Sequence, residues 1–480
     1  MPKTYDAIIT GSGPNGLAAA IRLQEMGLST IVFEQANIPG GATRTEELTL
    51  PGFKHDVGSS IHPLTIGSPF FSTLPLAEHG LEWIHPDIPF AHPFLDGTAF
   101  AAYRDIDQTA AQMDKDQRSY QSLFHSLAEK WDNVSPDLLG PLGIPAHPAD
   151  FISFGLKAGL SAKSLAKMYF QQEKSRAFFY GAAAHSTLPL NKLASASFGL
   201  VLFVLAHKIG WPFPKGGATK ISDALISYYK SLGGSLALGV PVKDLRELPK
   251  ARAYLFDLTP RQLLAIKGTE LPALYRRRLE NFRYGAGVFK MDWALHNPIP
   301  FTNEKCRKAG TIHLGFSTRQ MELSEKVIHQ NGLVKEPYVL LAQHSPFDSS
   351  RAPAGKHTAW AYCHVPNGCE LDMTEEVENQ IERAAPGFKD SIIARATHNT
   401  KQMETFDPNL VGGDVNGGMQ DIWQLFTRPV ASLSPYSTPN PGVYICSAST
   451  PPGGGVHGMG GYNAAQKVLH DHFPELLAGK

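Results

Sequence analysis

A glycine-rich turn between two short apolar segments constrains the fold of this chain more than any other feature. Gly11, Gly13 and Gly16 form the pattern GxGxxG. Residues 7–10 before the turn predict a buried strand, residues 17–26 after it predict a helix that ends at Gly27, and residues 30–33 predict a second buried strand. Strand, helix and strand in this order predict a right-handed βαβ crossover and a parallel sheet.

The turn has the form of a dinucleotide-binding fingerprint. In that reading Gly11 makes the tight turn, Gly13 lets the backbone approach a pyrophosphate, and Gly16 lets the helix pack on the strand. Between these glycines, Pro14 and Asn15 belong to the helix N-terminus, where free amides and a positive dipole end favour phosphate. A purely structural glycine turn is the alternative.

An acidic residue follows the second predicted strand. Glu34, with Gln35 next to it, lies at the distance of about 20 residues from the turn at which a carboxylate meets the adenosine ribose. A carboxylate at that place accepts hydrogen bonds from ribose hydroxyls and disfavours a 2′-phosphate. The fingerprint alone does not separate FAD from NAD.

A second glycine pair favours FAD. Residues 40–44, which include Gly41 and Arg44, resemble the pyrophosphate motif of the large FAD family that contains amine oxidases and carotenoid desaturases. The resemblance implies that Arg44 contacts phosphate, with the two-pronged geometry that a guanidinium offers. A plain turn and a surface arginine are the alternative reading of the same residues.

Two further segments extend this resemblance. Residues 443–450, the glycine loop 453–461 and a helix predicted at 462–473 resemble the last FAD motif of the family, which implies cofactor contacts for Ser449, Gly458, Met459 and Gly460. Residues 214–217 before a helix predicted at 222–232 resemble an internal motif, and Val242, at the end of a strand predicted at 235–242, takes the position beside the adenine. Together the motifs resemble the phytoene-desaturase-like branch of the FAD-dependent amine oxidase superfamily.

The resemblance and the pattern of segments predict an α/β fold with two domains. The Rossmann-type FAD-binding domain, with a parallel sheet, takes residues 1–72, 212–275 and 432–480. The inserted α+β substrate-binding domain, with a mixed or antiparallel sheet and a helical portion, takes residues 73–211 and 276–431. Residues 108–211 are mainly helical in pattern, residues 287–295 alternate like a half-buried strand, and residues 375–385 predict an amphipathic helix.

Two residues are candidates for catalysis. Lys290 lies inside an apolar segment, and lysine is rarely buried without a reason. By resemblance to amine oxidases it holds a water near the flavin, whereas the plainer reading gives it solvent or Asp292 as its partner. His457, in the loop expected beside the flavin, is a candidate proton donor, with hydrogen-bonded scaffolding as the alternative.

These features predict an FAD-dependent oxidoreductase that abstracts hydride from a largely apolar small molecule and desaturates or isomerises a C–C bond. A flavin amine oxidase is one alternative, with Tyr436 and Tyr462 as candidates for its aromatic cage, and a binding or assembly protein that holds FAD without turnover is another. No second GxGxxG is present for an NAD(P)H domain, so oxygen or a quinone is the expected electron acceptor.

Charge and cysteine usage exclude other classes of function. The formal net charge is zero, which argues against a nucleic-acid partner. The four cysteines form neither a CxxC pair nor a zinc spacing, so we expect no metal centre and a reducing cytoplasmic setting. No secretory signal pattern opens the sequence, and no apolar run reaches the ~18 residues of a membrane span. Peripheral contact with a membrane stays an alternative, and the sequence does not predict the oligomeric state.

Overall fold

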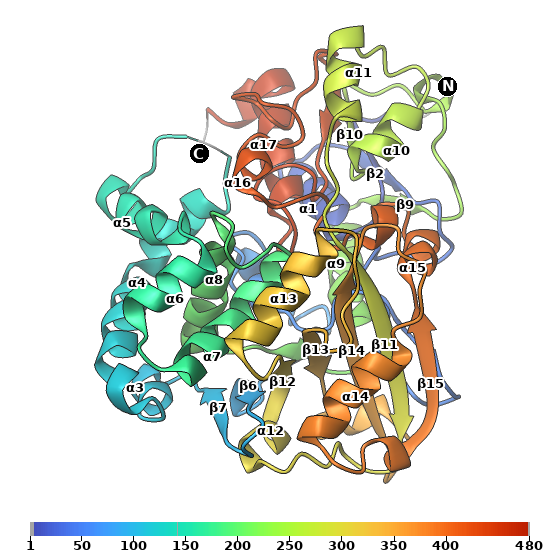
Figure 1. Ribbon diagram of the computed structural model, residues 1–480. Coiled ribbons are helices and arrows are strands. Elements are labelled where there is room, and N and C mark those ends of the chain that lie inside the picture. The colour runs from blue at the N-terminus through green and yellow to red at the C-terminus, as the bar shows by residue number, and fades with distance from the viewer. Residues whose placement is uncertain (1–3, 142, 479–480) are drawn as a thin grey trace.

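The computed structural model describes residues 4–141 and 143–478. A five-stranded parallel sheet forms one half of the molecule, at the top of Figure 1, with the strand order β16-β10-β1-β2-β9. These strands come from three distant parts of the chain: β1 (Ala7–Thr10), β2 (Thr30–Phe33), β9 (Ser235–Ala237), β10 (Ala253–Phe256) and β16 (Val443–Ile445). The predicted Rossmann-type parallel sheet is confirmed.

Three helices pack on this sheet. They are α1 (Pro14–Glu25), α9 (Thr219–Ser231) and α17 (Met459–His472). The helix α1 begins at Pro14, three residues earlier than predicted. Proline suits the first turn of a helix, because the amide that it lacks would have no hydrogen-bond partner within the helix and its fixed φ is already helical. The predicted strand at 235–242 stops after Ala237, and the chain then runs to β10 as a linker without another strand of the sheet.

The second half of the molecule contains a seven-stranded mixed sheet with the order β15-β11-β14-β13-β12-β6-β7. Only β12 and β6 pair in parallel, and the other pairs are antiparallel. The bounds are β6 (Ile88–Pro93), β7 (Ala99–Ala102), β11 (Gly287–Leu295), β12 (Ala309–Leu314), β13 (Val339–Ala342), β14 (His357–Val365) and β15 (Ile392–His398).

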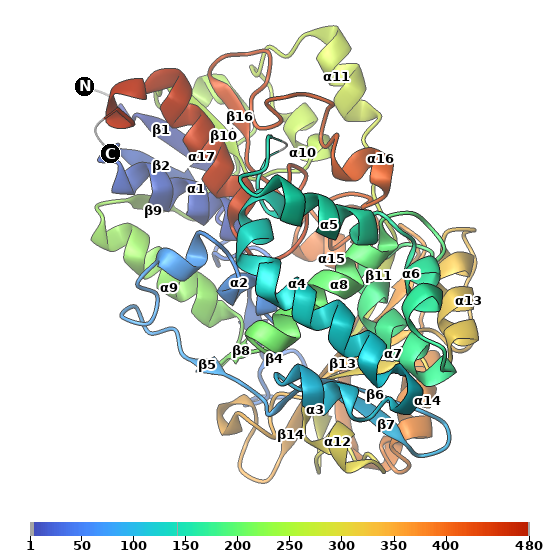
Figure 2. The ribbon, with the colours of Figure 1, turned by 90° about the vertical axis from the view of Figure 1, so that its left-hand side faces the viewer.

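A helical layer covers one face of the seven-stranded sheet, as Figure 2 shows. Its helices are α3 (Ile106–Ala110), α4 (Gln117–Leu138), α5 (Pro148–Ala158), α6 (Ala162–Tyr169), α7 (Glu173–Ala183) and α8 (Ser195–Lys208). Phe178 of α7 and Phe203 of α8 pack with Phe90 of β6 in the core between the layers. The predicted helical portion is confirmed.

The opposite face of the same sheet packs against α12 (Glu304–Arg307) and α14 (Thr374–Ala384). The strand predicted at 287–295 is confirmed with these bounds, but the prediction that it is half-buried is wrong, because all nine residues of β11 are buried. Polar and apolar side chains nevertheless alternate along part of β11. Val288, Lys290 and Asp292 share one face, while Phe289 and Met291 lie in the apolar core on the other.

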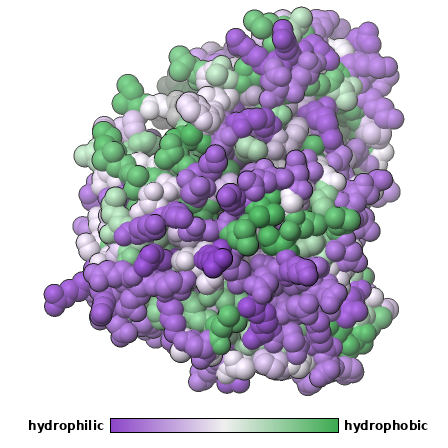
Figure 3. All heavy atoms as spheres, viewed as in Figure 1, coloured by the Kyte–Doolittle hydropathy of each residue, from purple (hydrophilic) through white to green (hydrophobic). Residues whose placement is uncertain are grey.

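Further helices are α2 (Pro63–Ile66), α10 (Pro260–Ala265), α11 (Ala273–Glu280), α13 (Thr318–Ile328), α15 (Thr400–Phe406) and α16 (Ile422–Leu425). In Figure 3 one face of the molecule is mainly hydrophilic, with hydrophobic residues in separate patches. Within the part of the chain that the structure describes, no helix is both long enough and apolar enough to cross a membrane. The domain boundaries given above remain predictions.

Candidate functional site

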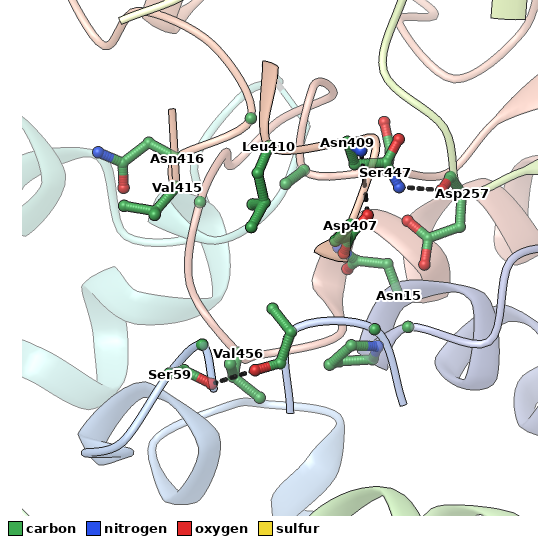
Figure 4. Close-up of a pocket in the computed structure, with 18 of the residues that line it drawn as sticks. Asn15, Ser59, Asp257, Asp407, Asn409, Leu410, Val415, Asn416, Ser447 and Val456 are labelled. Carbon is green, nitrogen blue, oxygen red and sulfur yellow. Dashed lines mark hydrogen bonds between the residues drawn. The ribbon is translucent and has the colours of Figure 1, made fainter. Parts of the chain in front are cut away.

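A cavity of about 560 Å³ runs from the glycine turn after β1 to the seven-stranded sheet. Figure 4 shows the polar residues Asn15, Asp257 and Asp407 on one side of it, with Leu410 and Val415 further along. Its volume lies within the range of about 300–1,000 Å³ that small-molecule and cofactor sites occupy. The cavity therefore joins the predicted cofactor motifs to the predicted substrate-binding half.

The glycine turn is packed so closely that side chains would not fit. A Cβ atom on Gly16 would lie 2.1 Å from the carbonyl oxygen of Gly11, and a Cβ on Gly13 would lie 2.8 Å from Oδ2 of Asp257. Gly11 has φ of +99°, a conformation that glycine adopts without strain. The turn thus presents bare backbone and the start of α1 to the cavity, as a pyrophosphate requires.

Glu34 is held in place by its own neighbours. Its Oε2 accepts hydrogen bonds of 2.8 Å from the amide and the hydroxyl of Ser12, and its Oε1 accepts one of 2.9 Å from the amide of Ala36. A carboxylate offers about four lone-pair sites, so acceptor capacity remains for ribose hydroxyls. Glu34 and Gln35 both line the cavity.

Arg44 lines the cavity from the second glycine motif. Its guanidinium lies 3.7 Å from the ring centroid of Phe406, and Nη2 donates a 3.0 Å hydrogen bond to the Phe406 carbonyl. Its Nε is buried and has no hydrogen-bond partner among the described residues. A buried cationic donor without a partner fits an anionic group such as a phosphate.

Two buried carboxyl groups also border this end of the cavity. Burial raises the pKa of Asp257 to about 7, and burial also raises the pKa of Asp407. Asn409 links the segments that carry these two carboxyl groups (Figure 4). Its backbone N–H donates a 3.0 Å hydrogen bond to Asp407 Oδ1, and its side-chain Nδ2 donates one of 3.1 Å to the backbone carbonyl of Asp257. A protonated carboxyl is compatible with a neighbouring anion, whereas a charged one is not.

Asp257 was not predicted from the sequence, whereas the segment 407–414 is predicted as an ordered loop close to the cofactor, without a role for Asp407. Asp257 directly follows β10, the neighbour of β1, so it lies at the carboxyl edge of the parallel sheet where such folds bind ligands. Recognition of residues 253–256 as a strand would have revealed it. Asp407 follows α15, and no sequence signal places that helix beside the sheet.

Most of the predicted cofactor residues line the cavity. They are Gly11, Gly13, Pro14, Asn15, Glu34, Gln35, Gly41, Arg44 and Val242. Gly16 packs behind the turn on Gly11 instead. The structure places these residues together, and their contacts with a cofactor remain a prediction.

The C-terminal motif reaches the cavity through residues other than those predicted. Ser447, Ala448 and the segment 454–456 line it. Ser449, Gly458, Met459 and Gly460 lie just behind this surface; Ser449, for example, donates a 2.7 Å hydrogen bond to the Gly417 carbonyl. The loop sequence indicates proximity to the cavity, but it does not specify which of its residues face it.

His457 lies behind the cavity wall, fully enclosed. Its Nδ1 accepts a 3.0 Å hydrogen bond from the amide of Met459, the first residue of α17. Burial lowers the pKa of His457 to about 4, so the ring is neutral near pH 7. These contacts correspond to the scaffolding alternative, and the predicted proton-donating role has no support from the geometry.

Lys290 lines the cavity from β11, and it forms a buried ion pair with Asp292 on the same face of the strand. Burial lowers the pKa of Lys290 and raises the pKa of Asp292 to about 6. Nδ1 of His55 lies 3.7 Å from Oδ1 of Asp292, and Nε2 of His55 is 2.8 Å from the Thr49 hydroxyl. Lys290 thus faces the cavity, as a role beside the flavin requires, and it is also paired with Asp292, as the plainer alternative predicts.

The far end of the cavity is mostly apolar. Its lining residues include Phe198, Leu202, Trp211, Val288, Leu340, Trp360, Tyr362 and Val415. The ring centroids of Trp360 and Tyr362 lie 5.3 Å apart in an edge-on arrangement. Tyr436 and Tyr462, the candidates for an amine cage, do not line the cavity. Tyr436 donates a hydrogen bond to the Pro451 carbonyl, and the ring of Tyr462 packs against Phe70 in a tilted arrangement.

Comparison with known proteins matches residues 9–72 to the model of an NAD(P)-binding Rossmann-like domain. Over 97% of this chain and 94% of its own length, the mouse pyridine nucleotide-disulfide oxidoreductase domain-containing protein 2 is 27% identical. A lycopene-forming phytoene desaturase of Pantoea ananas is 25% identical over 94% and 96%. The structure of cyclohexylamine oxidase from Brevibacterium oxydans superposes with a TM-score of 0.60 at 16% identity, covering 99% and 100% of the two chains.

Proposed function

We propose that this chain, an oxidoreductase that resembles the phytoene-desaturase-like branch of the FAD-dependent amine oxidase superfamily, binds FAD in its cavity and removes hydride from a largely apolar substrate. The product carries a new or a shifted C=C bond. The observation that carries the proposal is the continuity of one cavity, which is lined both by Gly13 and by Leu202 and Trp360.

The polar end of the cavity fits FAD in three respects. The turn at Gly13 offers bare backbone, Arg44 has an unpaired buried donor, and Glu34 has free acceptor capacity. When bound, FAD supplies a hydride acceptor, and the protein supplies orientation and electrostatics. We further propose oxygen or a quinone as the final electron acceptor.

The apolar end fits the substrate. Leu202, Trp211 and Leu340 exclude water from the far part of the cavity and favour a hydrocarbon chain by burying it. Lys290 is an ionisable group in the cavity lining that can hold a water or move a proton at its Nζ, and its lowered pKa eases loss of that proton. Asp292 positions the ammonium by pairing with it.

Amine oxidation is a second candidate, favoured by the fold similarity to cyclohexylamine oxidase and by the aromatic pair Trp360 and Tyr362 in the cavity. Anaerobic mixing of the yellow protein with polyenes, fatty acids and amines, followed by absorbance near 450 nm, tests the proposal. We expect bleaching by an apolar unsaturated substrate. Bleaching by amines alone would replace the proposal with the second candidate, and no bleaching by any compound would favour a protein that binds FAD without turnover.

A further inference from the structure

His185 places an accessible ring nitrogen in the cavity lining. The residue lies in the short 3-10 helix Ala184–Ser186 that follows α7, it lines the cavity, and it is partly exposed. Its Nε2 is 3.0 Å from Nε2 of His313, while its Nδ1 makes no hydrogen bond with the described residues. Nδ1 of His313 is enclosed and lacks a partner, whereas Nδ1 of His185 is not enclosed. It is therefore open to a ligand in the cavity.

His313 has a second histidine, His92, at its side in the seven-stranded sheet. The strands β12 and β6 pair in parallel with Ile312 beside Ala91, so the next residues, His313 and His92, are neighbours. A Cβ atom on Gly181 of α7 would lie 2.9 Å from Nδ1 of both rings. The two Nδ1 atoms therefore face the same small space, and both are buried without a hydrogen-bond partner among the described residues.

The contacts in this row determine which nitrogen of each ring carries the proton. Burial lowers the pKa of all three rings, so each is neutral and has one N–H near pH 7. Nε2 of His92 donates a 3.1 Å hydrogen bond to the carbonyl of Gly315, so its Nδ1 is a bare lone pair. That lone pair favours the proton of His313 on Nδ1, which leaves Nε2 of His313 as an acceptor.

The last ring of the row is fixed by the one before it. Because Nε2 of His313 accepts, Nε2 of His185 donates across the 3.0 Å contact. A neutral imidazole has only one N–H, so Nδ1 of His185 is bare. At this point the cavity lining therefore offers a hydrogen-bond acceptor and no donor.

A bare nitrogen in apolar surroundings favours a hydroxyl group. The ring of Trp211, which also lines the cavity, lies 5.6 Å from that of His185 in an edge-on arrangement. A hydrocarbon would displace water from Nδ1 and leave the acceptor without a partner, and an aldehyde would bring only a second acceptor. An alcohol brings the O–H donor that Nδ1 lacks.

The electrostatics at His185 disfavour an ammonium group as the donor. Burial, together with the nearby His364, lowers the pKa of His185, and no carboxylate among the described residues opposes this effect. A cation beside the ring would therefore be buried without a counter-charge. The donor that fits is uncharged.

We propose that the substrate is an apolar alcohol whose hydroxyl group donates a hydrogen bond to Nδ1 of His185. His313 is a positioning residue, because it holds the proton of His185 on Nε2, and His92 orients His313 in turn. This inference rests on the proposed function, because it assigns the class of substrate for the same cavity.

Isothermal titration calorimetry of the FAD-loaded protein tests this inference. The flavin is first reduced by light under anaerobic conditions, so that binding is measured without turnover. The probes are geraniol and farnesol, each compared with its aldehyde, its primary amine and the hydrocarbon of the same carbon skeleton. We expect at least one of the alcohols to bind about tenfold or more tightly than its three counterparts.

Two variants separate the ligand contact from the positioning role. His185→Phe removes the acceptor and keeps a ring, so the preference for the alcohol should vanish while the hydrocarbon binds as before. His313→Phe frees His185 to carry its proton on Nδ1, which then donates. In that variant we expect the aldehyde and the alcohol to bind about equally, and both more tightly than the hydrocarbon. A merely structural defect would weaken all probes alike.

His62→Phe is the matched control. His62 also lines the cavity, but its unpaired Nε2 is enclosed and cannot meet a ligand. Its replacement should leave the preference for the alcohol intact. Should His313→Phe fail to fold, the head-group comparison and His185→Phe decide the outcome.

Three results would overturn the inference: no alcohol that binds more tightly than its counterparts, an unchanged preference in His185→Phe, or an equal loss of preference in His62→Phe. An unchanged preference in His313→Phe would overturn the positioning role. None of them bears on FAD content, which is measured separately from the absorption spectrum of the same samples before reduction. A protein without FAD would instead contradict the proposed function.

Discussion

The carboxylate of Asp257 accepts a 2.8 Å hydrogen bond from the backbone amide of Gly16, at the start of the helix that follows the glycine turn. Its pKa is raised to about 7, chiefly by burial, so it is protonated below that pH and charged above it. A diphosphate at the same helix N-terminus would meet a second negative charge at high pH.

FAD binding should therefore weaken as the pH rises through 7. The bound diphosphate raises the pKa of Asp257 further, binding takes up a proton, and the dissociation constant should grow by up to about tenfold per pH unit above 7. Fluorescence titration of the apoprotein from pH 6 to 9 measures this. Asp257→Asn should bind FAD with little pH dependence, and an equally steep profile in that variant would contradict the assignment.

The bare backbone at Gly13 should be essential for the cofactor. The purified protein should be yellow and release FAD rather than FMN on denaturation. Gly13→Leu should abolish FAD binding, because its side chain collides with Asp257 and occupies the place of the pyrophosphate. Gly155→Leu is the control, since Gly155 is exposed with open space at its Cβ position, and it should keep full FAD content. Stoichiometric FAD in Gly13→Leu would refute the site.

Removal of the Glu34 carboxylate should weaken FAD binding by one to two orders of magnitude, since each charge-assisted hydrogen bond contributes about 1.5–3 kcal/mol. The Glu34 carboxylate also accepts hydrogen bonds from the amide and the hydroxyl of Ser12, so Glu34→Ala disturbs the glycine turn itself. Ser12→Ala separates the two effects, because it removes a turn contact and leaves the carboxylate. We expect Glu34→Ala to lower the affinity much more than Ser12→Ala in equilibrium titrations, and equal affinities would assign Glu34 a structural role only.

Lys290 should act on flavin chemistry without contributing to cofactor affinity. Lys290→Met removes the charge and keeps the apolar stem, so FAD should stay bound while flavin reduction by substrate, or reoxidation by oxygen, slows by about tenfold or more. Anaerobic and aerobic stopped-flow measurements separate the two half-reactions.

The ion pair requires a second variant for comparison. In Lys290→Met the carboxyl of Asp292 loses its partner, and its pKa, already about 6, should rise further so that the group is neutral. Asp292→Asn keeps the lysine and removes the partner charge. Rates like those of wild type in Lys290→Met would leave Lys290 with a structural role, whatever the result for Asp292→Asn.

The parallel-sheet half was predictable from local sequence because its determinants are local. The turn at Gly11 and the strands on either side of it lie within 30 residues, and their periodicity is clear. The burial of β11 was not predictable in the same way. Lys290 and Asp292 look like solvent-facing positions, but Lys290 lines the cavity and Asp292 lies next to His55, a residue from a distant part of the chain.

The cavity lining shows the same limit. Glu34 and Arg44 belong to short sequence motifs, and each motif can be recognised within a single segment of the chain. Thr311, Trp360 and Asp407 come from segments without a motif, and only strand register and long-range packing bring them to the cavity. For His457 the sequence correctly predicts a loop beside the cavity, but the imidazole ring packs behind the cavity lining.

Gly461 of α17 lies so close to α1 that a Cβ atom there would be 1.8 Å from the carbonyl oxygen of Asn15. The strands β10 and β16 likewise complete the sheet that β1 begins. During synthesis the glycine turn therefore emerges from the ribosome more than 400 residues before the helix that packs against it. The nascent N-terminal segment must therefore remain competent to fold until translation is nearly finished.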